Sequence, residues 1–186
     1  MKVVLVAAVF LGLINSALAA SVDESKADWR VWPKVGEAQL SMLFFDIYHS
    51  RLLSPTGQYQ LEEDVTPHPL ALSITYQRDI SQQQLLDATI EQWQKLGYNP
   101  QQIEPWAKQL ASVFPNIEEG TNLTYVTDGK TGRFYYFKNS SEGQIGVSPQ
   151  QIGNIDDESF NDAFVSIWLA PNTEYPKLRS QLIGSR

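Results

Sequence analysis

The stretch TNLTYVTDGKTGRFYYFKNSSEGQIGV, residues 121–147, contains two successive hairpin patterns. Short runs of aromatic and β-branched residues are separated by clusters of glycine, aspartate and serine, as is typical of β-hairpins. In the middle run, Phe134 and Tyr136 share one face, because side chains alternate along a strand. Tyr135 and Phe137 lie on the other face. We therefore predict an antiparallel meander that is covered, at least in part, on both sides.

The rest of the chain surrounds this meander with further strands and with helices. Residues at period two predict strands within 29–48, at 58–61 and over 70–76. Ser81 and Gln84 form a capping box ahead of a helical stripe, and Asp157 is a good helix N-cap. The predicted helices are 81–96, 105–114, 157–170 and 174–183, with a single helical turn at 148–151. Strands and helices do not alternate singly, so the expected fold class is α+β, with an antiparallel β-sheet covered by a helical layer.

The start of the chain has the pattern of a secretory signal peptide. One positive charge precedes an apolar run at residues 3–14, and Ala17-x-Ala19 is typical of a cleavage site. This run is shorter than the roughly 20 residues needed to cross a bilayer, so we expect no membrane span. The expected organisation is a cleaved signal peptide at 1–19, an N-terminal lead-in at 20–32 and a single domain at 33–184.

Charge and cysteine content indicate the compartment and exclude one class of partner. Removing residues 1–19 from the 186 leaves 167, and removing Lys2 leaves 13 basic against 21 acidic side chains, a net charge near −8. Nucleic-acid binding needs a basic face, so we expect no nucleic-acid partner. The chain has no cysteine, whereas eukaryotic extracellular domains usually contain disulfides. We therefore predict a bacterial periplasmic protein.

Residue counts argue against most catalytic chemistries. Without cysteine there is no thiolate nucleophile and no sulfur-ligated metal. The two histidines, His49 and His68, do not have the spacing of a helical zinc-binding pair. No Gly-x-Ser-x-Gly occurs, and Gly129-Lys130-Thr131 lacks the upstream glycine of a phosphate loop. We expect no metal and no cofactor, assign no catalytic residue, and favour a protein that is not an enzyme.

Aromatic side chains are plentiful, and several arginines border apolar segments. A gap between the sheet and the helices would be apolar, with aromatic walls and one arginine, which suits a flat aromatic molecule or a fatty acid. The alternative is that these aromatic side chains simply fill the core. The candidate ligand-binding residues are Tyr48, Arg51, Tyr76, Arg78, Tyr136 and Trp168.

Several segments resemble, in order, the chalcone isomerase-like proteins and in particular their secreted bacterial branch. They are VGEAQL at 35–40, FDIY at 45–48, LSITYQRDI at 72–80, FNDAFVSIWL at 160–169, and Pro176-x-Leu178-Arg179-x-x-Leu182-x-Gly184. The resemblance covers about residues 33 to 184. It implies an open-faced β-sandwich in which a sheet and a helical layer enclose an apolar cleft. Family members close chalcones to flavanones by intramolecular addition of a phenolate, or bind fatty acids.

The resemblance carries the family's catalytic residues over poorly. The family enzymes have an arginine on the first long strand, and the matching position in this chain falls between Arg30 and Gln39. They also have a threonine shortly after it, and the matching position falls near the apolar Leu43. Tyr48 matches the family motif, and we interpret it as a packing residue. An apolar side chain cannot hydrogen-bond a polarised carbonyl, so we predict a non-catalytic binder of an apolar or aromatic small molecule, either fatty acid or polyphenol-like. Intramolecular lyase (isomerase) activity and a periplasmic protein-interaction module remain alternatives.

Overall fold

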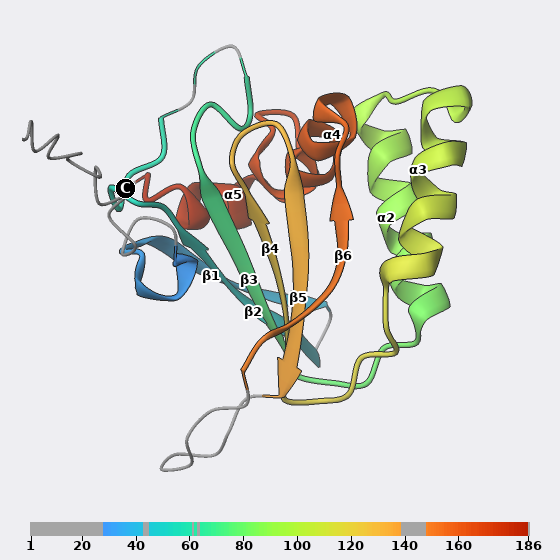
Figure 1. The fold of residues 1–186 in the computed structure, drawn as a ribbon, viewed down its shortest axis with the longest axis horizontal. Coiled ribbons are helices and arrows are strands. Elements are labelled where there is room, and N and C mark those ends of the chain that lie inside the picture. Colours follow the sequence, from blue (N-terminus) through green and yellow to red (C-terminus); the bar gives the residue numbers. More distant parts are fainter. Residues whose placement is uncertain (1–27, 43–44, 61, 63, 139–147, 186) are drawn as a thin grey trace, which may run out of the picture.

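Six strands form one antiparallel sheet in which each strand pairs with its neighbours in the chain (Figure 1). The computed structural model describes residues 28–42, 45–60, 62, 64–138 and 148–185. The strands are β1 Lys34–Met42, β2 Phe45–Leu53, β3 Leu70–Tyr76, β4 Thr121–Thr127, β5 Gly132–Lys138 and β6 Gln150–Ile155. The helices are the 3-10 helix η1 Trp29–Val31, then α2 Gln82–Leu96, α3 Pro100–Val113, α4 Glu158–Leu169 and α5 Pro176–Leu182.

The α+β class, with an antiparallel sheet and a helical layer, is confirmed. The capping box that the sequence predicts at Ser81 and Gln84 is present at the start of α2. Asp157 caps α4 by accepting a hydrogen bond from the Phe160 backbone N–H. The predicted signal peptide at 1–19 and the last run of the predicted meander, at 143–147, lie outside the described residues.

Three local predictions are wrong. Residues 150–155 form β6 instead of a helical turn, because their backbone groups pair with the edge of β5. Residues 58–60 form no strand, since the Gln58 backbone exchanges hydrogen bonds with the Ser54 hydroxyl. The second helix starts at Pro100 instead of residue 105, because Asn99 and Gln102 supply a second capping box and Pro105 is accommodated inside the helix.

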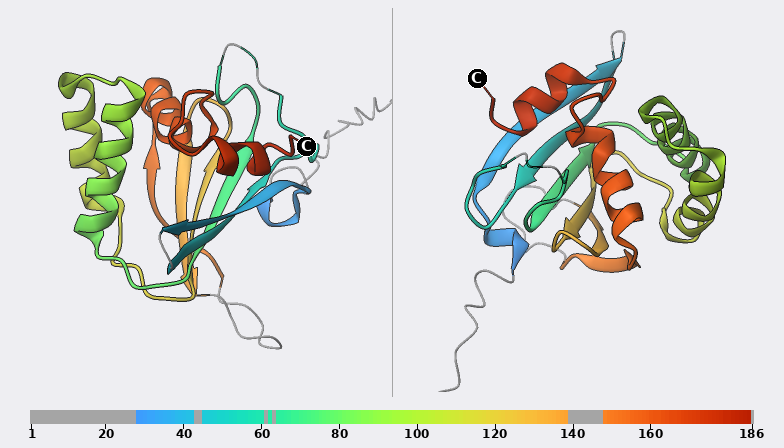
Figure 2. Two further views of the ribbon diagram at one scale, coloured as in Figure 1. Left: turned by 180° about the vertical axis from the view of Figure 1, so that it is seen from behind. Right: turned by 90° about the horizontal axis from the view of Figure 1, so that it is seen from above.

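All four α-helices lie on one side of the curved sheet, and η1 lies on the other (Figure 2). Alternation of side chains along β3 explains why the two faces of the sheet differ. Leu72, Ile74 and Tyr76 face the helices and are buried, whereas Ser73 faces the opposite side and bonds to residues of β4. On that side the Trp29 ring of η1 lies 5.9 Å from the ring of Tyr135. Strand β5 is therefore covered on both faces, as its aromatic pattern predicts.

Helix α5 packs directly onto β1 (Figure 2). The contact requires Gly36, because a Cβ atom there would overlap the backbone carbonyl groups of Gln181 and Leu182. This close approach fixes α5 above the β1–β2 hairpin. None of the helices in the described part of the chain is long and apolar enough to cross a membrane.

Candidate functional site

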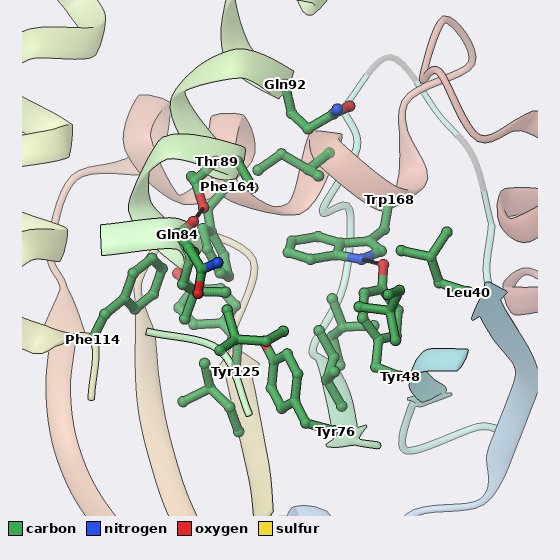
Figure 3. Close-up of a pocket in the computed structure, with 18 of the residues that line it drawn as sticks. Leu40, Tyr48, Tyr76, Gln84, Thr89, Gln92, Phe114, Tyr125, Phe164 and Trp168 are labelled. Atoms are coloured by element: carbon green, nitrogen blue, oxygen red, sulfur yellow. Dashed lines mark hydrogen bonds between the residues drawn. The ribbon is translucent and has the colours of Figure 1, made fainter. Parts of the chain in front are cut away.

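A cavity of about 170 Å³ lies between the sheet and the helical layer (Figure 3). Its walls come from β1 to β5, from α2 and α4, and from the segments beside them. A cavity of about 150 Å³ with an apolar lining is large enough to bind benzene. Met42 lines the cavity and is 55 % exposed, so the cavity reaches solvent beside the end of the β1–β2 hairpin. The space therefore accommodates one ring or a short hydrocarbon chain, with room for the rest of a ligand to extend outward.

Tyr48 and Tyr76 form part of the sheet side of the cavity (Figure 3). They are direct partners in the β2–β3 register, and their ring centroids lie 6.0 Å apart in an edge-on arrangement. Their exposed fractions are 8 % and 3 %. Period-two alternation turns both rings toward the helices, so two phenol groups enter the cavity from adjacent strands.

Helix α4 forms the opposite wall. Trp168 and Phe164 are separated by four residues, so they share one face of this helix, and their ring centroids lie 5.3 Å apart. The Phe164 ring also packs 4.8 Å from Tyr125 and 5.0 Å from Phe134, measured between centroids. These aromatic contacts give the cavity rigid walls.

Most polar groups around the cavity are already bonded within the protein. The Trp168 Nε1–H donates to the Tyr48 hydroxyl over 2.9 Å, joining α4 to β2. The Tyr125 hydroxyl donates to Asn161 Oδ1 over 2.8 Å. On α2, the Thr89 hydroxyl donates to the backbone carbonyl of Leu85, and the Gln92 amide donates to Glu174 at 3.2 Å. These bonds fix the walls and leave few groups free to meet a ligand.

The described lining contains no charged side chain. Burial raises the pKa of the Tyr48 hydroxyl well above its usual value, although the bond from Trp168 acts in the opposite direction. Burial also raises the pKa of Tyr76, and the neighbouring Tyr48 adds to the effect. Both phenols are therefore neutral at physiological pH and serve as hydrogen-bonding groups, not as bases.

Comparison with known proteins identifies the family. The profile of the family described as chalcone isomerase-like matches residues 36–184. An uncharacterized protein of Haemophilus influenzae is 30 % identical over 160 residues, which cover 86 % of this chain and 72 % of that protein. The chain belongs to the chalcone isomerase-like family.

Within this family, the resemblance implies an arginine and a threonine beside the reacting group. No arginine lines the cavity among the described residues. Arg30 lies in η1, across the sheet, and pairs with Asp28. Gln39 is exposed and its amide donates to Gln77. Leu43, where the threonine's place falls, lies outside the described residues.

The structure brings three of the six candidate ligand-binding residues of this chalcone isomerase-like protein together at the cavity: Tyr48, Tyr76 and Trp168. The other three lie elsewhere. Arg51 is three residues from Tyr48 on the same strand, so it faces the opposite side of the sheet, near Trp29. The Arg78 guanidinium lies 5.9 Å from the centre of the Phe45 ring.

Tyr136 is half-buried on β5, and its hydroxyl donates to the Asn116 carbonyl outside the cavity. The candidates do not include other lining residues, such as Tyr125 and Phe164. Phe164 could have been found from its four-residue spacing to Trp168. Tyr125 faces inward by alternation on β4, but its position beside the cavity depends on the order of the strands.

The described part of the site shows no group of metal-binding side chains. Across the described residues, no three His, Asp or Glu side chains gather closely enough to act as ligands. The cavity offers an enclosed apolar space, an aromatic surface and the two phenol groups of Tyr48 and Tyr76.

Proposed function

We propose that this protein is a periplasmic, non-catalytic binder of a small apolar or aromatic molecule. The observation that carries the proposal is the uncharged aromatic cavity of about 170 Å³ between sheet and helices. Cavities of this kind, with many apolar walls and few polar groups, are typical of small-molecule sites. The signal-peptide pattern at residues 1–19 and the absence of cysteine support the periplasmic location.

The chemistry of the lining supports binding without catalysis. General acid–base catalysis needs a group whose pKa lies near the working pH. The described lining has neither a carboxylate nor an imidazole, and burial moves the pKa of its tyrosines Tyr48 and Tyr76 away from neutrality. Such a site holds a ligand without moving a proton.

Calorimetric titration of the purified protein with ethylbenzene, a one-ring apolar probe, tests binding in the cavity. Leu123 lines the cavity, so Leu123→Phe fills part of it and should weaken binding at least tenfold. Leu96 is half-buried on α2 and does not line the cavity, so Leu96→Phe is a matched control that should bind normally. Thermal melts confirm that both variants fold. Wild-type protein that takes up no ethylbenzene, or Leu123→Phe that binds equally well, would refute the proposal.

A separate assay tests the absence of catalysis. A chalcone is mixed with the protein, and loss of its enone absorbance is followed. We expect the uncatalysed rate, since the described lining contains no charged group to stabilise developing charge. Sustained turnover above that rate would show that the protein is an isomerase.

A further inference from the structure

The hydroxyl group of Tyr76 has no hydrogen-bond partner among the described residues, although its side chain is only 3 % exposed. Every fully enclosed side-chain oxygen or nitrogen in the described part of the chain does have a partner. The Tyr76 hydroxyl must therefore border open space, and Tyr76 lines the cavity. Figure 3 shows its ring rising from the sheet toward the space between Tyr125 and Tyr48. A buried phenol with both its donor and its acceptor unused is costly unless something in the cavity bonds to it.

Tyr48, the strand partner of Tyr76, leaves a second donor unused. Its oxygen accepts the Trp168 Nε1–H at 2.9 Å, and no acceptor for its own proton lies among the described residues. The third buried tyrosine of the lining, Tyr125, differs because its hydroxyl donates to Asn161. Two phenols on paired positions of adjacent strands therefore each carry a donor that no described residue uses.

The lining also determines which charge a ligand can carry. An ionised carboxylate that enters an apolar space loses its hydration, and it needs a cation to compensate. The described lining contains no lysine, arginine or histidine, and neither Arg51 nor Arg78 is part of it. A cationic ligand would likewise find no carboxylate in the described lining. An uncharged oxygen, such as a carbonyl or ether oxygen, avoids both costs and accepts hydrogen bonds from phenols.

The geometry points to an uncharged ligand that places one ring, or a segment of similar size, in the cavity and accepts a hydrogen bond at its oxygen from Tyr76, with Tyr48 as the second donor. This inference rests on the proposed binding function and narrows its ligand class. It favours neutral aromatic ketones, esters or ethers over fatty-acid anions.

Three one-ring probes of similar shape, measured by calorimetric titration at pH 7, test the inference. Acetophenone carries a carbonyl oxygen, benzoate carries a charged carboxylate, and ethylbenzene carries no oxygen. We expect benzoate to bind at least about thirtyfold more weakly than acetophenone, because its charge is uncompensated. We expect Tyr76→Phe to weaken acetophenone binding roughly three- to tenfold, as for one neutral hydrogen bond, and to leave ethylbenzene binding unchanged.

Tyr136→Phe is the matched control, because it removes a tyrosine hydroxyl that bonds outside the cavity. It should leave the affinity for all three probes unchanged. If wild-type protein fails to bind ethylbenzene, the proposed function fails, and this inference fails with it. If ethylbenzene and acetophenone both bind, but Tyr76→Phe leaves acetophenone unaffected or benzoate binds as tightly as acetophenone, this inference alone is overturned and the binding function stands.

Discussion

Replacing Tyr48 with phenylalanine removes the acceptor that joins α4 to the sheet. In the folded protein, Trp168 Nε1 donates to the Tyr48 hydroxyl over 2.9 Å, and both side chains are at least nine-tenths buried. Tyr48→Phe leaves the indole N–H without a partner. An orphaned buried donor costs about 1–3 kcal/mol. The Tyr48 hydroxyl itself has a proton with no acceptor, and removing that unused donor offsets part of the cost. We therefore expect the variant to be destabilised by about 1–2 kcal/mol.

Tyr76→Phe is the internal reference for this measurement. The two tyrosines are paired in register on adjacent strands, and the same atom is removed from each. The Tyr76 hydroxyl has no partner among the described residues, so its removal should change the free energy of unfolding by less than about 0.5 kcal/mol, or stabilise the protein slightly.

Urea unfolding, followed by fluorescence and circular dichroism, measures both changes. In a thermal melt, the same loss of 1–2 kcal/mol should lower the melting temperature of a domain of this size by roughly 2–8 °C. Equal stability of Tyr48→Phe and Tyr76→Phe would refute the reasoning, because it would mean that the Trp168 bond contributes nothing specific.

Three further predictions concern other parts of the molecule. Gly36→Ala should destabilise the protein by about 1–3 kcal/mol by forcing α5 away from β1, with faster proteolysis near the C-terminus as the check. Burial raises the pKa of Asp162, so its ionised form opposes folding. Protonation of Asp162 should therefore add stability as the pH falls through the raised pKa. Asp162→Asn should be more stable than wild type at pH 7, and this difference should shrink at pH 3. Urea midpoints of variant and wild type that differ equally at both pH values would contradict this. Arg51→Ala and Arg78→Ala should bind ethylbenzene and acetophenone normally in titrations, since neither side chain lines the cavity; a tenfold loss in either would place an arginine at the site.

The structure also narrows the alternatives that follow from the sequence. Side chains that filled the space between sheet and helices would favour a protein-interaction module, but that space is a cavity of about 170 Å³. Met42, an apolar residue at the end of β1, lines the cavity and is 55 % exposed. The cavity therefore opens beside an apolar edge of the sheet.

The sequence by itself determines the local structure wherever a short period or a cap is strong. Alternation identifies β3 and the β4–β5 hairpin, and the side chains of Ser81 and Asp157 mark the starts of α2 and α4. Prediction fails where the signal is weak, as at β6, whose Gly153 and polar neighbours become a strand only because β5 offers an unpaired edge. The aromatic content also indicates an apolar interior, but not whether that interior is filled.

The tertiary structure alone decides which residues meet at the cavity. The β2–β3 register places Tyr48 opposite Tyr76, and the packing of α4 brings Trp168 to Tyr48 across 120 residues of sequence. The opposite facing of Arg51, by contrast, follows from alternation along β2 and can be worked out from the sequence. Local periodicity fixes the face of a strand on which a side chain lies, but register and helix placement arise from contacts between distant segments. A short sequence window carries no information about those contacts.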